Sequence, residues 1–240
     1  MEKRDVPARD TTSSPKPWKL SKSQWAVYYW LLAHSKWNSF DKENHYYIYK
    51  DTFTYTQIMK SVGIKSPQTI TAAMKKLEEE RIIVTSEFSK GAYLIYTTEI
   101  YVPMSVGVLR YLLAFNKYLD PSMLITMFAI LVRLFRVEKG KPTDFTKVML
   151  GRLLGLAKQN IDDSGIILGL AVLEHTGLIS LNKASYTNTL GVPCIRYTLT
   201  NVDTNGHMVE AMLNEEDEIS ESSIKAIWEK IATININNES

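Results

Sequence analysis

A pattern of two helices followed by a β-hairpin occurs twice in the 240-residue chain, and this repeat constrains the fold more than any other feature. Phe53 lies 92 positions before its counterpart Phe145, and Leu77 lies 96 positions before Leu173. The copies therefore differ by four residues, which we place in the turn between the helices. Recurrence at matched positions is better evidence for two folded units than either copy alone.

The first copy carries local signals for each of its elements. Thr54 is a suitable N-cap for a helix that ends at Gly63, because glycine reaches the left-handed backbone conformation without a side-chain clash. Ser66 and Pro67 then begin a second helix, with the Ser66 hydroxyl as the capping group. The predicted strands of the following hairpin are residues 82–87 and 92–98.

The second helix of this copy has two chemically different faces. Ile70, Met74 and Leu77 recur at helical spacing and are predicted to face the core. The opposite face carries hydrogen-bonding and cationic side chains, which suit a helix that enters the major groove of DNA. The predicted DNA-binding residues are Lys65, Ser66, Gln68, Thr69, Thr71, Ala72, Lys75, Lys76 and, in the hairpin turn, Lys90.

Two interpretations of this polar face stay open. Gln68 can pair with adenine, while Lys75 and Lys76 can neutralise phosphates or reach guanine. Alternatively, the two lysines pair with the acidic run at 78–80 at i, i+3 and i, i+4 spacing and form an ordinary solvated face.

The segment from Thr54 to Ile83 resembles the winged helix-turn-helix DNA-binding superfamily, in the order short helix, Gly-Ile turn, Ser-Pro-led helix and hairpin. Taken from Ser21, with the insertion that contains Trp37 and a predicted strand at 46–49, the first unit is also similar to the N-terminal modules of phage and plasmid replication initiators. The superfamily resemblance implies double-stranded DNA binding and frequent dimerisation. The second resemblance implies binding to a replication origin.

The second copy keeps the fold-making residues but changes the outward ones. The positions that correspond to Thr71, Lys75 and Lys76 are Ile167, Ala171 and Val172. Because an apolar helix face is normally covered by protein, we expect association or an interdomain contact there. A second DNA contact at residues 158–160 is the alternative. Ile224 and Trp228, in a predicted C-terminal amphipathic helix, are further expected association residues.

The predicted fold class is therefore mainly α with small β-hairpin wings (α+β), as two tandem winged-helix domains. The predicted parts are a flexible basic arm at 1–20, a DNA-reading winged-helix domain at 21–100, a helical connector at 101–120, an association winged-helix domain at 121–202, and an acidic segment with the amphipathic helix at 203–240. Within these parts we also expect a first helix with Ser21 or Ser23 as its N-cap and with one apolar face, a helix at 106–118 in the connector, and an apolar helix at 122–135. The expected strands of the second hairpin are 178–182 and 194–200, joined by a loop at 183–193.

Composition excludes several classes of protein. The apolar fraction of 45% and charged fraction of 22% are typical of a globular protein, and no apolar stretch is long enough to span a bilayer. The polar N-terminus lacks a signal-peptide core, which favours a cytoplasmic location. Cys194 is the only cysteine, and the four histidines are scattered. We therefore expect no metal site, no cofactor and no enzymatic activity.

The leading hypothesis from sequence is a sequence-specific double-stranded DNA-binding protein. The expected role is a plasmid or phage replication initiator or organiser that binds origin repeats as a homodimer and recruits a replication protein such as a helicase loader. One alternative is a winged-helix transcription regulator (repressor) that binds an operator. The other is a protein-interaction scaffold that does not bind DNA.

Overall fold

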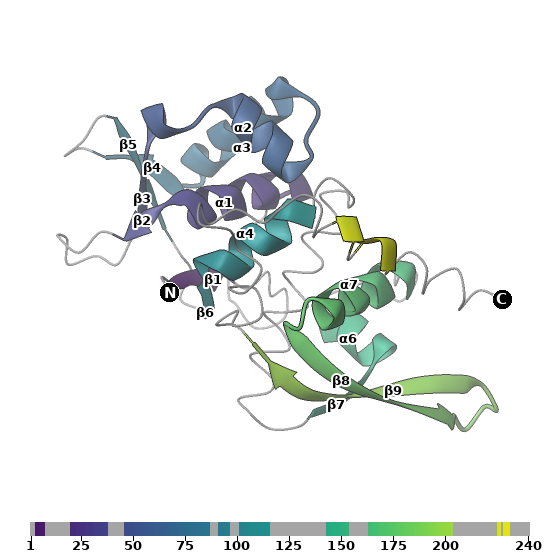
Figure 1. Ribbon diagram of the computed structural model, residues 1–240. Helices are drawn as coiled ribbons and strands as arrows, with labels where there is room; N and C mark the ends of the chain where they lie inside the picture. Colours follow the sequence, from purple (N-terminus) through teal and green to yellow (C-terminus); the bar gives the residue numbers. More distant parts are fainter. Residues whose placement is uncertain are drawn as a thin grey trace. The chain divides into compact units, whose positions relative to one another are not determined.

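The structure, a computed structural model, describes residues 3–7, 20–37, 46–86, 91–96, 101–115, 143–153, 163–203, 225–226 and 228–230. The chain divides into two compact units, here called unit 1 (Met1–Pro7 and Trp18–Ile125) and unit 2 (Ala8–Pro17 and Thr126–Ser240). Both combine helices with small antiparallel sheets, so the α+β class is confirmed (Figure 1).

Unit 1 contains a four-stranded antiparallel sheet in the order β2-β3-β5-β4, together with a separate pair formed by β1 and β6. Its described elements are β1 (Lys3–Pro7), α1 (Lys22–His34), β2 (Lys36–Trp37), β3 (Tyr46–Tyr49), a 3-10 helix (Lys50–Thr52), α2 (Tyr55–Val62), α3 (Pro67–Glu79), β4 (Ile83–Thr85), β5 (Ala92–Ile95), β6 (Tyr101–Ser105) and α4 (Val106–Ala114).

Helix α1 is the centre of unit 1. It begins with a capping box, in which the Ser21 hydroxyl accepts from the Gln24 amide and the Gln24 side chain accepts from the Ser21 amide. Every residue from Trp25 to Ala33 is buried, whereas the sequence predicted a single apolar face. The difference arises because α1 contacts α2, α3 and α4, so no side of its middle part reaches solvent.

Two predicted boundaries of unit 1 require correction. The sequence predicts residues 101–115 in a connector with a helix at 106–118. The helix is confirmed as α4, whereas the segment is part of unit 1 instead of a connector, since α4 packs on α1 with Val108 and Leu109 fully buried. Residues Lys3–Pro7, expected in a flexible arm, form β1 and pair antiparallel with β6. Both contacts join segments that are far apart in the sequence, so no local pattern predicts them. The paired strands β1 and β6 are about a hundred positions apart.

One face of the sheet of unit 1 packs against the core and the other face is more exposed. Tyr46 and Ile48 of β3 are buried, while Tyr47 is half-buried and Tyr49 is exposed, the alternation expected for a strand with one side on the core. The predicted strand at 46–49 is thus confirmed, and Tyr47 and Tyr49 lie on the face away from the core.

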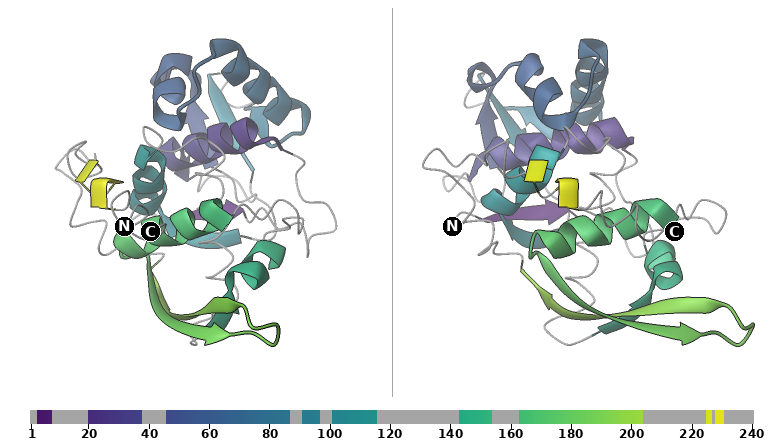
Figure 2. Two further views of the ribbon diagram at one scale, coloured as in Figure 1. Left: turned by 90° about the vertical axis from the view of Figure 1, so that its right-hand side faces the viewer. Right: turned by 45° about the vertical axis from the view of Figure 1, so that its right-hand side comes forward.

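Unit 2 repeats the order strand, helix, helix, hairpin, with the last strand of the hairpin in the middle of the sheet (Figure 2). Its described elements are β7 (Thr143–Thr146), α6 (Lys147–Leu153), α7 (Asp163–His175), β8 (Ile179–Thr187) and β9 (Pro193–Val202). The sheet order β7-β9-β8 corresponds to β3-β5-β4 in unit 1.

The matched positions of the two units make matched contacts. Thr54 accepts a hydrogen bond from the Gln57 amide, and Thr146, 92 positions later, accepts one from the Met149 amide. Phe53 and Phe145, each directly before these capping residues, are buried. The repeat found in the sequence is therefore also a repeat of local structure.

The hairpin of unit 2 is longer than predicted. Residues 183–187, expected in a loop, continue β8, and Thr187 pairs with Pro193 across the turn. The predicted apolar helix at 122–135 and the alternative DNA contact at 158–160 lie outside the described residues.

Candidate nucleic-acid interface

Helix α3 begins at the predicted position, although not with the predicted cap. Ser66 is the N-cap residue and Pro67 occupies the first turn, but no side-chain hydrogen bond caps the helix. The Ser66 hydroxyl instead donates to Oε1 of Gln68 at 2.7 Å. Gln68 is exposed and keeps its Nε2 donors and a second lone pair on Oε1 for a ligand.

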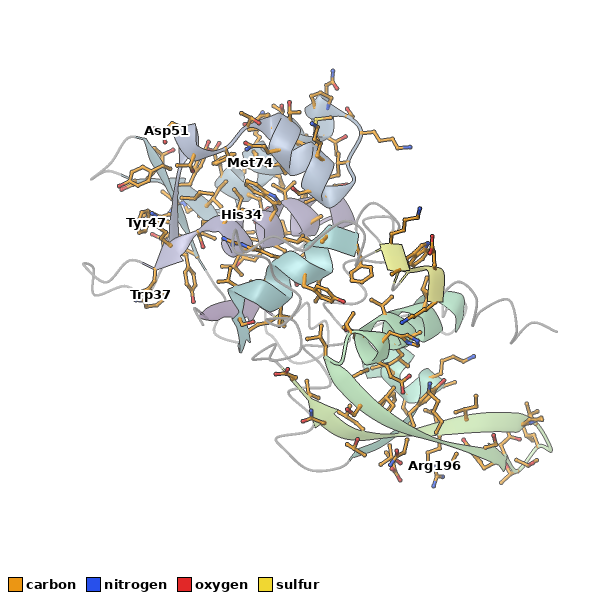
Figure 3. All side chains as sticks on the ribbon, in the orientation of Figure 1. His34, Trp37, Tyr47, Asp51, Met74 and Arg196 are labelled. Atoms are coloured by element: carbon orange, nitrogen blue, oxygen red, sulfur yellow. The ribbon has the colours of Figure 1, made fainter. Side chains whose placement is uncertain are left out.

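The two faces of α3 are divided as predicted. Ile70, Met74 and Leu77 are buried together with Ala73, and Met74 points into the interior of unit 1 (Figure 3). On the other face, the exposed predicted residues are Gln68, Thr71, Ala72 and Lys75, and the half-buried ones are Ser66, Thr69 and Lys76. The hydroxyl of Thr71 donates to the Pro67 carbonyl oxygen at 3.1 Å, so it is already engaged within the helix.

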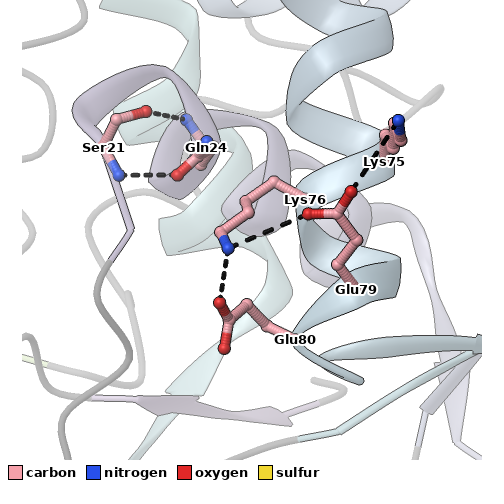
Figure 4. Close-up of polar contacts among 6 residues, drawn as sticks. All are labelled: Ser21, Gln24, Lys75, Lys76, Glu79 and Glu80. Carbon is pink, nitrogen blue, oxygen red and sulfur yellow. Dashed lines mark hydrogen bonds and ion pairs between the residues drawn. The ribbon is translucent and has the colours of Figure 1, made fainter.

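The two lysines of α3 differ in how strongly they are paired (Figure 4). Nζ of Lys76 lies 2.6 Å from Glu80 and 3.8 Å from Glu79, and its side chain is 37% exposed. Its hydrogen bond to Glu80 raises the pKa of Lys76 above the usual lysine value. Nζ of Lys75 lies 3.9 Å from Glu79, and its side chain is 77% exposed. The ion pairs of the alternative interpretation are present, but Lys75 remains accessible to a phosphate.

The last turn of α3 is tied to the sheet through another carboxylate. Burial, and secondarily the negative charge of Glu78 and a hydrogen bond to it, raise the pKa of Tyr93 to about 12. Lys50 lies over the Tyr93 ring at 4.2 Å and donates to Thr85 at 3.0 Å. Lys50 is therefore held at the sheet surface, away from the polar face of α3.

Three cations flank α3 in the sequence. Lys65, in the turn before the helix, is exposed, and Lys90 lies outside the described residues. Arg81, two residues after the end of α3, is exposed and has a left-handed backbone with φ of 56°. Arg81 is not among the residues predicted from sequence to bind DNA.

Lys60 is another exposed cation outside the set predicted from sequence. It lies on α2 between the buried residues Ile58 and Val62, so helical spacing already predicted that its side chain faces outward. The described polar surface of the two helices therefore carries Lys60, Lys65 and Lys75 as its more accessible cations.

The expected association residues of α7 need correction. Val172 is completely buried, and Ala171 is half-buried. The buried residues of α7 include two adjacent pairs, Gly169 with Leu170 and Val172 with Leu173. Adjacent residues of a helix point about 100° apart, so the buried face of α7 is wider than the buried stripe of α3. An apolar residue at the position of Lys76 thus joins the core of its own unit instead of a partner surface.

The remaining association residues are only partly described. The backbone of Ile167 belongs to α7, and Ile224 lies outside the described residues. Trp228 lies in a short helical stretch and is half-buried.

Among the described residues, no group of three or more histidine, cysteine, aspartate or glutamate side chains has the arrangement of a metal site. None of the helices described is both long and apolar enough to cross a membrane.

Comparison with protein-family models, with curated proteins and with solved structures gives no significant match, so the function has to be inferred from this chain's own residues and geometry.

Proposed function

We propose that this chain is a sequence-specific double-stranded DNA-binding protein that inserts the polar face of α3 into the major groove. The observation that carries the proposal is the division of α3 into a fully buried apolar side and an exposed side with Gln68 and Lys75. A helix with solvent-accessible amide and ammonium groups fits the donor and acceptor pattern of base edges and phosphates.

The arrangement of elements around α3 supports a winged-helix interpretation of both units. In each unit a strand precedes two helices, a hairpin follows them, and the last strand lies between the other two. In this interpretation α2 and α3 are the helix-turn-helix, and the hairpin of β4 and β5 is the wing. The proposal extends to a homodimer that associates through unit 2.

The biological role we favour is a plasmid or phage replication initiator in the cytoplasm that binds origin repeats and recruits a replication protein such as a helicase loader. It follows from the resemblance of unit 1 to the N-terminal modules of such initiators. A repressor that binds an operator would use the same surface, and the DNA sites selected from a random duplex library would distinguish the two.

The test is a duplex-binding titration of the full chain between 50 and 200 mM salt. Each phosphate contact contributes about 0.9 to the slope of log affinity against log salt. Lys75→Ala should weaken binding to all duplexes and reduce the slope by about that amount. The matched control is Lys225→Ala, since Lys225 is 64% exposed and lies 3.7 Å from the carboxylate four residues later, Glu229.

Sequence preference is tested separately. Gln68→Ala should leave non-specific affinity unchanged and relax preference at one or two base pairs, because the amide reads bases and carries no charge. If the full chain binds no duplex at low salt, the DNA interpretation fails and the scaffold alternative takes its place. If Lys75→Ala behaves as Lys225→Ala, the interface lies elsewhere.

A further inference from the structure

The tip of the β8–β9 hairpin presents apolar side chains to solvent. Leu190 is 85% exposed and Val192 is 51% exposed. Residues 179–202 contain no carboxylate, and the five residues 188–192 carry no charge. Such exposure of large aliphatic side chains at one place is typical of an interaction site.

This tip is held rigidly. The Asn188 side chain accepts hydrogen bonds from the amides of Leu190 and Val192, both at 2.9 Å. The Asn188 amide donates to the Val192 carbonyl oxygen, and Gly191, with φ of 77°, donates to the Asn188 carbonyl oxygen. The two apolar side chains are thus ordered before any partner arrives, which lowers the entropic cost of binding.

A groove that matches the tip in chemistry lies on the same unit. It has a volume of about 630 Å³ and is formed by the end of β7, the start of α6 and residues of both hairpin strands near the turn. Val148, Pro193, Ile195 and Tyr197 give it apolar walls, and Val148 and Ile195 are 43% and 48% exposed. Lys147 is the charged residue among those that line it.

Two cations of the hairpin, Arg196 and Lys183, lie outside the lining of the groove. Arg196 lies 5.1 Å from the centre of the Tyr186 ring and points away from α7 (Figure 3). Lys183 is paired with Glu174 of α7 at 2.7 Å. Neither cation therefore has to be buried unpaired if the tip and the groove are covered.

We propose that two copies of this chain associate through unit 2, with the Leu190–Val192 tip of each copy seated in the Val148–Ile195 groove of the other. A second copy is the partner that satisfies both features at once, since a twofold axis makes every tip-to-groove contact occur twice. An unrelated partner would need its own apolar knob and its own apolar groove at matching positions. Because the tip carries no charge, its insertion into the apolar groove would not bury an unpaired charge.

This inference replaces the α7 face as the association surface and supplies the dimer contact assumed in the proposed function. It does not depend on DNA. Its tests use the full chain without nucleic acid, so its failure and the failure of DNA binding are seen in separate experiments.

The first test measures oligomeric state by sedimentation velocity over a range of protein concentration. Leu190→Asp and Val148→Asp should each raise the dimer dissociation constant by about tenfold or more, because a carboxylate would enter an apolar contact. Thr189→Asp is the matched control, since it adds the same charge to an exposed neighbouring position of the turn and should leave the dimer intact. A monomeric wild-type chain, or a Leu190→Asp chain as dimeric as wild type, would overturn the proposal.

The second test examines reciprocity and does not depend on the stability of a single variant. A mixture of the Leu190→Asp and Val148→Asp chains retains one intact tip-to-groove contact, whereas either chain alone retains none. Association in the mixture should exceed that of both separate chains. Equal association in all three samples would exclude this arrangement.

Proximity can be measured directly because Cys194, the one cysteine of the chain, also lines the groove. Leu190→Cys should give a covalent dimer under mild oxidation, through a disulfide between the introduced thiol and Cys194 of the second copy. Adding Cys194→Ser should abolish that product. A covalent dimer that persists without Cys194 would place the tips against each other and contradict the proposal.

Discussion

Arg81 and Gly177 occupy the same position in the two units, two residues after the last residue of the second helix, and both have a left-handed backbone. The φ angles are 56° and 72°. In each unit the next residue donates its amide to the carbonyl oxygen five positions earlier, from Ile82 to Leu77 and from Leu178 to Leu173. The constant offset of 96 shows that this helix end, and not only the hydrophobic pattern, is repeated.

Arg81→Gly should therefore stabilise the protein. A left-handed conformation costs a non-glycine residue roughly 1–2 kcal/mol, and glycine avoids this cost. Glycine also loses more backbone entropy on folding, which offsets part of the gain, so the free energy of unfolding should rise by about 0.5–1 kcal/mol. Denaturant unfolding checks this. Arg81→Ala is the control because it removes the cation and keeps the strain, so an equal gain in both variants would assign the effect to charge.

Thr54 and Ser66 provide a second comparison, between a helix start with a side-chain cap and one without. Thr54 accepts from the Gln57 amide and Gln57 reciprocates, whereas the Ser66 hydroxyl donates to Gln68. Thr54→Ala should lower the free energy of unfolding by about 1 kcal/mol, and Ser66→Ala by much less. Equal losses would show that Ser66 caps α3 in solution.

The features predicted correctly from sequence are those with a local cause. The Thr54 cap, the end of α2 at Gly63 with φ of 66°, and the buried stripe of α3 each depend on residues that are close in sequence, with successive members at most four positions apart. Periodicity and capping chemistry are sufficient for such elements.

The features that sequence missed depend on distant partners. The pairing of Lys3 with Ser105 joins segments with no shared pattern, and the all-round burial of α1 requires α4. In the second hairpin, residues 183–187 contain lysine, serine and threonine, which suggested a loop, although they form an exposed part of β8. Within the site, the stronger pairing of Lys76 than of Lys75 depends on side-chain geometry that no spacing rule distinguishes.

His34 gives a prediction on pH. The residue reaches the surface, but its ring stacks on Trp30 with centroids 4.1 Å apart and its Nδ1 lies 2.8 Å from the Trp30 carbonyl oxygen. Desolvation, with a smaller contribution from the positive charge of Arg110, lowers the pKa of His34 to about 4, while the Trp30 hydrogen bond opposes the shift. Because solvent access moderates desolvation, we expect a measured pKa between about 4 and the unfolded value of 6.5.

The sign of the resulting stability change follows from proton uptake. Between pH 6.5 and 4 the unfolded chain binds a proton at His34 that the folded chain does not, so this contribution to stability is present above pH 6.5 and is lost as the pH falls. Unfolding should become less pH-dependent in that window in His34→Gln. An imidazole NMR titration with a midpoint at or above 6.5 would contradict the stacked, desolvated environment.

The acidic end of α3 leads to the last prediction, which concerns DNA affinity. Glu79 lies 3.9 Å from Lys75 and 3.8 Å from Lys76, so its carboxylate both holds the two ammonium groups and repels a phosphate. Glu79→Gln should therefore tighten duplex binding about two- to fivefold at low salt, the range expected for an exposed ion pair. The gain should fade as added salt shortens the Debye length. Glu229→Gln, at the partner of Lys225, is the matched control and should leave affinity unchanged. If Glu79→Gln has no effect at any salt concentration, the end of α3 faces away from the DNA and the contact is confined to its first turns, around Lys65 and Gln68.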